Sequence, residues 1–329
     1  MKVKLGLLAL NLKLRFTKPE NILIVHDDVD GISCASIALR ALKGKTVVVW
    51  SGPREIHETL SAIRVRGKLL CIMDIGVNND LIGVISSNLD RIRELGWRIY
   101  WIDHHSWSKE AIDEISKRVS KFVVESSPSA ARLVFKVFGG DEVSKRIVEI
   151  GDDADTATYS MWLSIAYRAL SSIERYRGKL VKMLASGVFT SGELEREAKR
   201  LVDREEKAIK REAERARILK TRSGRRFAVI DLRGRWGPGS RIAKFLAEEK
   251  GVDFSLVIYS CDSFGLYAGR DRSVNLKVIC DSRRGGGHPF ACGGRIDMPF
   301  YKGVFCRILR GRFTPSEIKS LINDVAETL

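Results

Sequence analysis

Five short apolar runs alternate with helical patterns over residues 20–125, and this alternation constrains the fold more than any other feature of the sequence. Continuous apolar strands separated by helices are typical of a parallel sheet covered on both faces. The strands predicted are Asn21–His26, Thr46–Trp50, Leu69–Asp74, Arg98–Asp103 and Lys121–Glu125. Because ligands of such sheets bind beyond the carboxyl ends of the strands, functional residues are expected there.

The rest of the chain predicts further helices, a charged connector and a second α/β region. Glu193–Lys220 is dense in Glu, Lys and Arg around a thin apolar stripe, which favours a helix that joins two domains over a free coiled coil. The other helices predicted are Ile32–Leu42, Leu81–Leu95, Ala130–Phe138, Tyr159–Leu184, Arg241–Lys250 and Pro315–Thr328. The extended segments predicted in the second region are Phe227–Leu232, Phe254–Ser260, Gly265–Arg270 and Val274–Cys280. The expected domains are residues 1–190, the connector 191–222 and residues 223–329.

The chain has no apolar run of the roughly 18 residues that a membrane helix requires. Its N-terminal leucines are interrupted by Asn11, Lys13 and Arg15, and the segment is interpreted as a strand or hairpin, not a signal peptide. The six cysteines form no Cys-x-x-Cys pair. This pattern predicts reduced, buried cysteines in a cytoplasmic protein, without a disulfide framework or zinc site.

Composition points to a polyanionic partner. The net charge is +16, from 57 basic and 41 acidic residues. Such an excess favours nucleic acid through counterion release, whereas the alternative is a solvated surface. Charged residues form 30% of the chain and glutamine is absent, a composition typical of thermophilic proteins, so part of the charge can serve heat stability.

Carboxylates and histidines gather at the predicted strand ends. His26, Asp28 and Asp30 alternate after the first strand, so they project to one side of an extended segment. Asp74 follows the third strand, and the run Asp103-His104-His105 follows the fourth. Each group alone is also compatible with helix-capping or solvated acidic turns. Three of the five histidines of the chain fall in these groups, however, which favours a site for divalent cations with a preference for manganese or other transition metals.

A fourth acidic group, Gly151-Asp152-Asp153-Ala154-Asp155, follows a predicted helical run. One of its carboxylates could bridge two metal ions, and ions at this edge would neutralise the repulsion between the acidic groups.

These four groups, in this order, resemble the motifs of the DHH phosphoesterase family, which is named for the Asp103-His104-His105 pattern. The resemblance implies two Mn²⁺ ions, with Mg²⁺ as an alternative. It assigns one ion to His26, Asp28, Asp74 and Asp155, and the other to Asp30, Asp74, His104 and Asp155. It also implies that His105 contacts the scissile phosphate and that Asp103 orients a histidine. The fourth motif is the loosest match, so Asp152 or Asp153 could replace Asp155.

The second region resembles the DHH-associated domain. Gly285, Gly286, Gly287 and His288 match its Gly-Gly-Gly-His signature, and Arg270, Arg272 and Ser273 resemble its Arg-Ser pair. Successive glycines allow close approach of backbone N–H groups to a phosphate, and a guanidinium suits phosphate contact. The resemblance implies that these seven residues bind the end of the substrate. Cys292 stands where the family usually has alanine.

The function implied is metal-assisted phosphodiester hydrolysis. A single-strand exonuclease of the RecJ-like or archaeal helicase-associated kind ranks first, with aromatics such as Trp107, Trp236 and Tyr301 suited to base stacking. The alternatives are a nanoRNase or phosphatase for short oligonucleotides and 3′-phosphoadenosine phosphate, a cyclic dinucleotide phosphodiesterase and, in another class, a catalytically silent replication scaffold. A helicase or a replication or repair protein is the expected protein partner. Basic residues at 307, 310 and 312 could extend the strand-binding surface. The sequence leaves open strand polarity, substrate length, RNA or DNA preference and oligomeric state.

Overall fold

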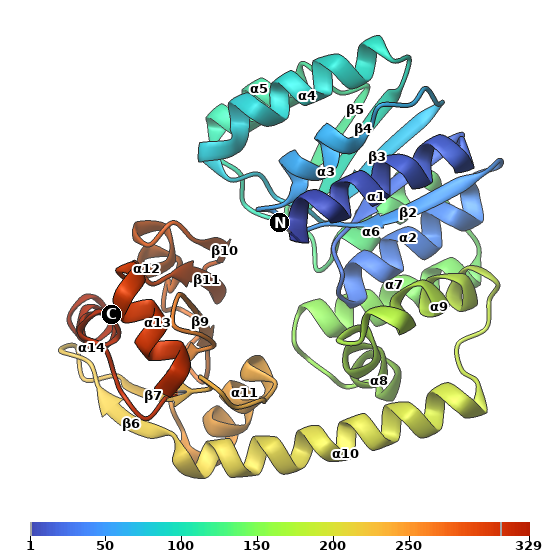
Figure 1. Ribbon diagram of the computed structural model, residues 1–329. Helices are drawn as coiled ribbons and strands as arrows, with labels where there is room; N and C mark the ends of the chain where they lie inside the picture. The colour runs from blue at the N-terminus through green and yellow to red at the C-terminus, as the bar shows by residue number, and fades with distance from the viewer. Residues whose placement is uncertain (1, 310) are drawn as a thin grey trace. The chain divides into compact units, whose positions relative to one another are not determined.

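The computed structural model describes residues 2–309 and 311–329, with side chains from residue 6 onward. Arg310 therefore lies outside the described residues. The chain forms two compact units, Met1–Leu201 and Val202–Leu329, and the boundary falls within one long helix (Figure 1). None of the described helices is long and apolar enough to cross a membrane.

The first unit contains a parallel sheet of five strands in the order β2-β1-β3-β4-β5. The strands are β1 (Asn21–Val25), β2 (Thr46–Trp50), β3 (Leu69–Met73), β4 (Arg98–Asp103) and β5 (Lys121–Val124). Every residue of β1 and β3 is buried, which explains why these strands have continuous apolar sequences. The predicted parallel α/β fold is confirmed.

Helices cover both faces of this sheet. One face packs against α3 (Ile56–Ala62), α4 (Ile82–Glu94) and α5 (Lys109–Ser116). A short 3₁₀ turn, η1 (Asn79–Leu81), precedes α4. On the other side, α2 (Val29–Ala41) contacts α6 (Ala130–Phe138), α7 (Glu142–Asp155) and α9 (Glu174–Ala185), as Figure 1 shows. The helices α2, α6 and α7 thus carry residues to the carboxyl edge of the sheet.

Two predictions in the first unit are wrong. The N-terminal segment is a helix, α1 (Lys2–Thr17), rather than a strand or hairpin. Its Leu7, Leu10 and Leu14 recur at helical spacing; Leu14 is fully buried, and Asn11 donates a hydrogen bond to the Ala62 carbonyl at 2.8 Å. The single helix predicted over Tyr159–Leu184 is divided into α8 (Trp162–Ser171) and α9.

The second unit contains a six-stranded sheet in the order β10-β11-β9-β8-β7-β6, antiparallel except for the β7–β8 pair. Its strands are β6 (Arg217–Lys220), β7 (Arg226–Asp231), β8 (Phe254–Ile258), β9 (Ser263–Ala268), β10 (Gly286–His288) and β11 (Ala291–Arg295). Its helices are α11 (Gly239–Lys250), α12 (Lys277–Ser282), α13 (Phe300–Leu309) and α14 (Ser316–Thr328). Two apolar clusters, one lined by α14 and one by α11, form its core.

The connector is a helix, α10 (Gly192–Arg215), but it ends earlier than predicted, because residues 217–220 pair with β7 as strand β6. The segment Val274–Cys280, predicted to be extended, instead leads into helix α12. Helix α13 was not predicted.

The prediction of six reduced cysteines is wrong for four of them. Disulfides join Cys261 to Cys306 and Cys280 to Cys292, whereas Cys34 and Cys71 of the first unit are free and buried. The bonded cysteines are 45 and 12 residues apart, so their proximity arises from the tertiary fold and not from a local sequence pattern.

Candidate metal centre

The first group of candidate residues lies in the turn between β1 and α2. His26 Nδ1 donates to Asp28 Oδ2 at 2.7 Å, and Asp28 Oδ1 caps α2 by accepting from the Gly31 N–H at 3.0 Å. A Cβ at Gly31 would lie 2.1 Å from the His26 carbonyl oxygen, so the turn requires glycine. His26 and Asp28 are therefore fixed together at the sheet edge.

Asp74 follows β3 in the left-handed backbone region, with φ of +59°. Asp tolerates this region better than most residues, but such strain is retained chiefly at functional sites. The side chain is buried, and its Oδ2 accepts no hydrogen bond within the described part of the chain. A buried carboxylate oxygen without a donor is costly unless a cation binds it.

His104 lies at the centre of three carboxylates. It follows β4 and is buried, and its Nδ1 donates to the Ser127 carbonyl at 3.1 Å. This bond directs Nε2 toward Asp30, Asp74 and Asp155, with N–O distances of 3.8, 3.6 and 3.5 Å. A backbone carbonyl that fixes one imidazole nitrogen while the other faces the ion is a common support for metal-binding histidine.

Asp30 is held by the N-terminus of α6. Its two carboxylate oxygens accept hydrogen bonds from the N–H groups of Ala130 at 2.6 Å and Ala131 at 2.8 Å. Helix N-termini favour negative charge, so this contact offsets part of the cost of burying Asp30.

A second set of contacts fixes the start of α6. Ser129 caps the helix by accepting from the Arg132 N–H, and its hydroxyl donates to Asp152 Oδ1 at 2.6 Å. Asp152 also pairs with the Arg132 guanidinium. Sequence reasoning did not identify Ser129, although the serine directly before the predicted helix was a capping signal.

The fourth motif forms the last turn of α7. Asp155 is its last residue and approaches His104. Asp153 instead accepts bonds from the Ser160 and Met161 N–H groups, each at 2.9 Å. Since Asp152 is bound to Ser129 and Arg132, the geometry favours Asp155 over its two neighbours as the ligand.

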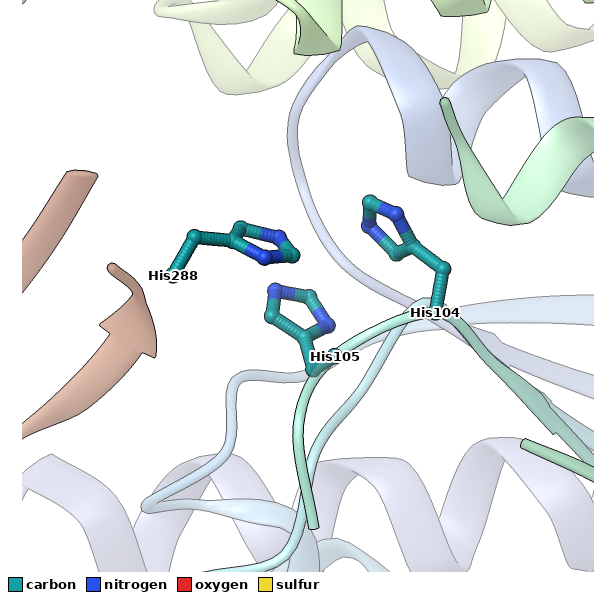
Figure 2. A group of neighbouring side chains, drawn as sticks. All are labelled: His104, His105 and His288. Carbon is teal, nitrogen blue, oxygen red and sulfur yellow. The ribbon is translucent and has the colours of Figure 1, made fainter. Parts of the chain in front are cut away.

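The rings of His105 and His104 are inclined by 66°, and their centroids lie 4.7 Å apart (Figure 2). Its Nδ1 donates to Asp103 Oδ1 at 2.8 Å, and the Trp107 indole N–H donates to Asp103 Oδ2 at 2.6 Å. Asp103 is fully buried, so its carboxylate fixes the orientation of His105, which is partly exposed. The contact of His105 with a scissile phosphate stays a prediction.

Burial and crowding shift the pKa values of the carboxylates. Burial, with repulsion from Asp155, raises the pKa of Asp30 to about 7, and burial raises the pKa of Asp155 to about 6. Burial and the charges of Asp30 and Asp28 raise the pKa of Asp74 well above its ordinary value. Attraction to Asp28 raises the pKa of His26 to about 10. Without a cation, the centre therefore retains protons near neutral pH.

The donor atoms fit two divalent cations. His26, Asp28 and Asp74 form one group and Asp30, Asp74 and His104 another, with the ligand atoms of each group within 4.8 Å of one another. Asp74 belongs to both groups, as a bridging carboxylate would. Mixed carboxylate and imidazole ligands suit Mn²⁺ and related ions. The donor set and the buried Asp74 oxygen thus agree with a pair of bound ions.

The second unit places its predicted residues at one end of its sheet. β10 contains Gly286, Gly287 and His288, and a Cβ at the preceding Gly285 would lie 1.9 Å from the Gly293 carbonyl oxygen. The Ala268 N–H donates to the Phe290 carbonyl at 2.8 Å, which brings the loop after β9 beside the turn after His288. That loop carries Arg270, Arg272 and Ser273, all of which are exposed.

Comparison with known proteins identifies the first unit. The model of the DHH family, N-terminal domain, matches residues 21–187, which is half of the chain. The chain belongs to the DHH family. No curated protein sequence matches it.

Solved structures share the fold over most of this DHH chain. A DHH-domain protein described as a member of the S1p family of ribosomal proteins has 16% identity and a TM-score of 0.60, over 99% of this chain and 92% of that one. A pGpG-specific phosphodiesterase, PggH from Vibrio cholerae, has 14% identity and a TM-score of 0.53, over 92% and 99%. RecJ from Thermus thermophilus in complex with Mn²⁺ has 15% identity and a TM-score of 0.52, over 98% of this chain but 54% of RecJ.

Proposed function

We propose that this DHH protein is a phosphodiesterase dependent on two divalent ions, preferentially Mn²⁺, that hydrolyses single-stranded nucleic acid from an end. The observation that carries the proposal is the pair of donor groups that share Asp74, whose buried Oδ2 accepts no hydrogen bond from the described residues. A carboxylate common to two sites is the arrangement that holds two ions close together.

The ligands proposed for the ions are His26, Asp28, Asp30, Asp74, His104 and Asp155. When bound, such ions activate water and stabilise charge on the phosphoryl oxygens. The protein fixes the ligands through the Ser127 carbonyl and the α6 N-terminus, so little reorganisation is required during the reaction.

His105 is proposed to donate a hydrogen bond to the scissile phosphate through Nε2. Its Nδ1 proton is held by Asp103, and the same carboxylate, aided by the His105 hydrogen bond, raises the pKa of His105 to about 9 despite the opposing effect of burial. A protonated imidazole with one nitrogen fixed presents the other as a donor to a negatively charged oxygen.

The second unit is proposed to hold the end of the strand. Gly285, Gly286, Gly287 and His288 offer backbone and imidazole donors, and the loop with Arg270, Arg272 and Ser273 lies beside them. The net charge of +16 supports a polyanionic substrate. A small end-binding region favours release of nucleotides from a terminus over internal cutting.

A second candidate is hydrolysis of very short oligonucleotides. This chain spans nearly the whole of the pGpG-specific phosphodiesterase but about half of RecJ. The pGpG-specific enzyme therefore has little structure beyond the part that it shares with this chain.

Digestion of end-labelled single strands with Mn²⁺ tests the proposal. The series extends from dinucleotides to strands of roughly thirty nucleotides, longer than a single binding domain covers. Stepwise shortening of the long strands supports the exonuclease. Fastest turnover on the shortest strands, with affinity independent of length, favours the second candidate. Absence of hydrolysis at every length, with Mn²⁺ bound, contradicts both and leaves a scaffold role.

A further inference from the structure

Helix α13 turns its apolar side outward. At 3.6 residues per turn, Phe300, Tyr301, Val304, Phe305, Ile308 and Leu309 occupy one continuous half of its circumference. All six side chains are exposed, Phe300 by 88% and Ile308 by 68%. An amphipathic helix on a protein surface ordinarily buries such a face, so the orientation of α13 is inverted.

Contacts on the opposite side fix this orientation. Cys306 is fully buried and bonded to Cys261, which follows β8. Lys302 Nζ lies 2.6 Å from Glu317 Oε1, and Arg307 Nη2 lies 3.3 Å from Asp262 Oδ2. These contacts come from two segments, the loop after β8 and helix α14, so α13 cannot rotate to bury its apolar half without breaking a covalent bond.

The composition of the face and its rim identifies what covers it. Contiguous exposed apolar patches mark association surfaces. Three of the six residues are aromatic, but Val304, Ile308 and Leu309 are aliphatic and offer no ring for stacking on nucleobases. The flanking Lys302 and Arg307 are already paired with acids of the same unit. The face is therefore apolar with a rim that carries both signs, rather than the unpaired cationic surface that a nucleic acid or anionic membrane requires.

We propose that a second copy of this chain covers the face, with α13 packed against α13 across a two-fold axis. A two-fold contact places the same patch on both sides. Such a contact therefore requires an apolar face, and a rim on which each charged side chain has a side chain of opposite charge nearby. Helix α13 has both features.

The test compares two phenylalanines that are almost equally exposed. Phe300→Asp removes part of the α13 face, whereas Phe16→Asp changes a residue on α1 that is 84% exposed. Neither side chain supports the core, so both variants fold. Sedimentation velocity over a concentration series should show a dimer for the unchanged protein and for Phe16→Asp. Phe300→Asp should weaken dimerisation by about 10-fold or more, as expected for an aromatic residue within an interface.

The salt dependence of association, together with added ligands, distinguishes a second copy from a nucleic acid or a membrane on the α13 face. Apolar dimerisation should persist or strengthen as salt rises, because repulsion between the basic copies is screened. A protein that stays monomeric at all concentrations overturns the proposal. So does equal weakening by both substitutions. If the protein is a monomer, a single-stranded oligonucleotide or phosphatidylglycerol vesicles are added to it. Binding that is abolished by Phe300→Asp and weakened by salt would show that a nucleic acid or an anionic membrane covers the face. None of these measurements requires catalytic activity.

Discussion

The two units hold their candidate functional residues in opposite ways. In the first unit Asp30, Asp74 and His104 are buried, and backbone groups fix two of them. In the second unit Arg270 and Arg272 are exposed on a loop. Buried, like-charged carboxylates destabilise the fold until cations bind, so their positions must be strongly constrained. The exposed arginines are solvated, so they destabilise the fold little when no polyanion is bound. The contrast supports the proposed division between ion binding in the first unit and substrate contact in the second.

The largest expected effect tests the buried side of this contrast. Asp74→Ala removes a ligand from both donor groups and should lower kcat/KM by roughly 1000-fold or more. Asp74→Asn, which tolerates the left-handed backbone that strains alanine, should not lose thermal stability in the metal-free protein, because repulsion with Asp30 and Asp28 is relieved. Asp80→Ala, at an exposed position in η1, is the control. Near-normal hydrolysis by Asp74→Ala in Mn²⁺ would refute the shared ligand.

The exposed side of the contrast predicts a different kinetic signature. Arg272→Ala and His288→Ala should each raise KM by about 10-fold, the usual effect of losing a hydrogen bond to a charged group. Their affinity for Mn²⁺, measured by calorimetry, should stay unchanged. Arg222→Ala, at an exposed position outside the proposed site, serves as the control. Weaker Mn²⁺ binding in either variant would show that the two roles are not divided between the units.

Ser129 tests whether the ion site depends on the start of α6. Ser129→Ala removes the helix cap and the bond to Asp152, and should weaken Mn²⁺ binding by about 10-fold, as for other residues that orient ligands. Ser129→Thr retains a capping hydroxyl and should restore affinity. Equal Mn²⁺ affinity in the alanine variant and the unchanged protein would mean that the α6 N-terminus holds Asp30 without this cap.

The smallest effect concerns pH. The pKa values of Asp30 and Asp155, about 7 and about 6, exceed those of unfolded carboxylates. Protons on these groups stabilise the metal-free fold at low pH, and this contribution is lost as pH rises through 6–7. Mn²⁺ replaces the protons, so it should raise Tm by a few degrees more at about pH 8 than at about pH 5. Calorimetric scans with and without Mn²⁺ measure this difference, and an equal increase at both pH values contradicts it.

The sequence predicted most of the first sheet and its edge. Its five strands lie within one residue of the predicted bounds, and the fully buried β1 and β3 leave an unambiguous apolar pattern. Residues after strand ends converge in any parallel sheet, which explains why His26, Asp74 and His104 could be grouped without a structure. Choosing Asp155 over its neighbours required the contacts of Asp152 and Asp153, which belong to tertiary structure.

The features that escaped prediction depend on contacts between distant segments. Cys261 and Cys306 are far apart in sequence, and spacing alone does not determine disulfide partners. The inverted helix α13 has the periodicity of a buried helix, so its pattern does not reveal which side faces solvent. The leucines of α1 have helical spacing, but the polar residues between them weaken this pattern.

The left-handed backbone at Asp74 has an evolutionary consequence. Asn and Gly adopt that conformation at least as easily as Asp, and neither carries the charge that burial penalises. A single inherited change at this position would therefore remove the shared ligand while leaving the fold as stable as before, or more so. If the proposed function holds, selection for hydrolysis, and not for folding, would retain an aspartate there. Descendants released from that selection would lose their chemistry before their architecture.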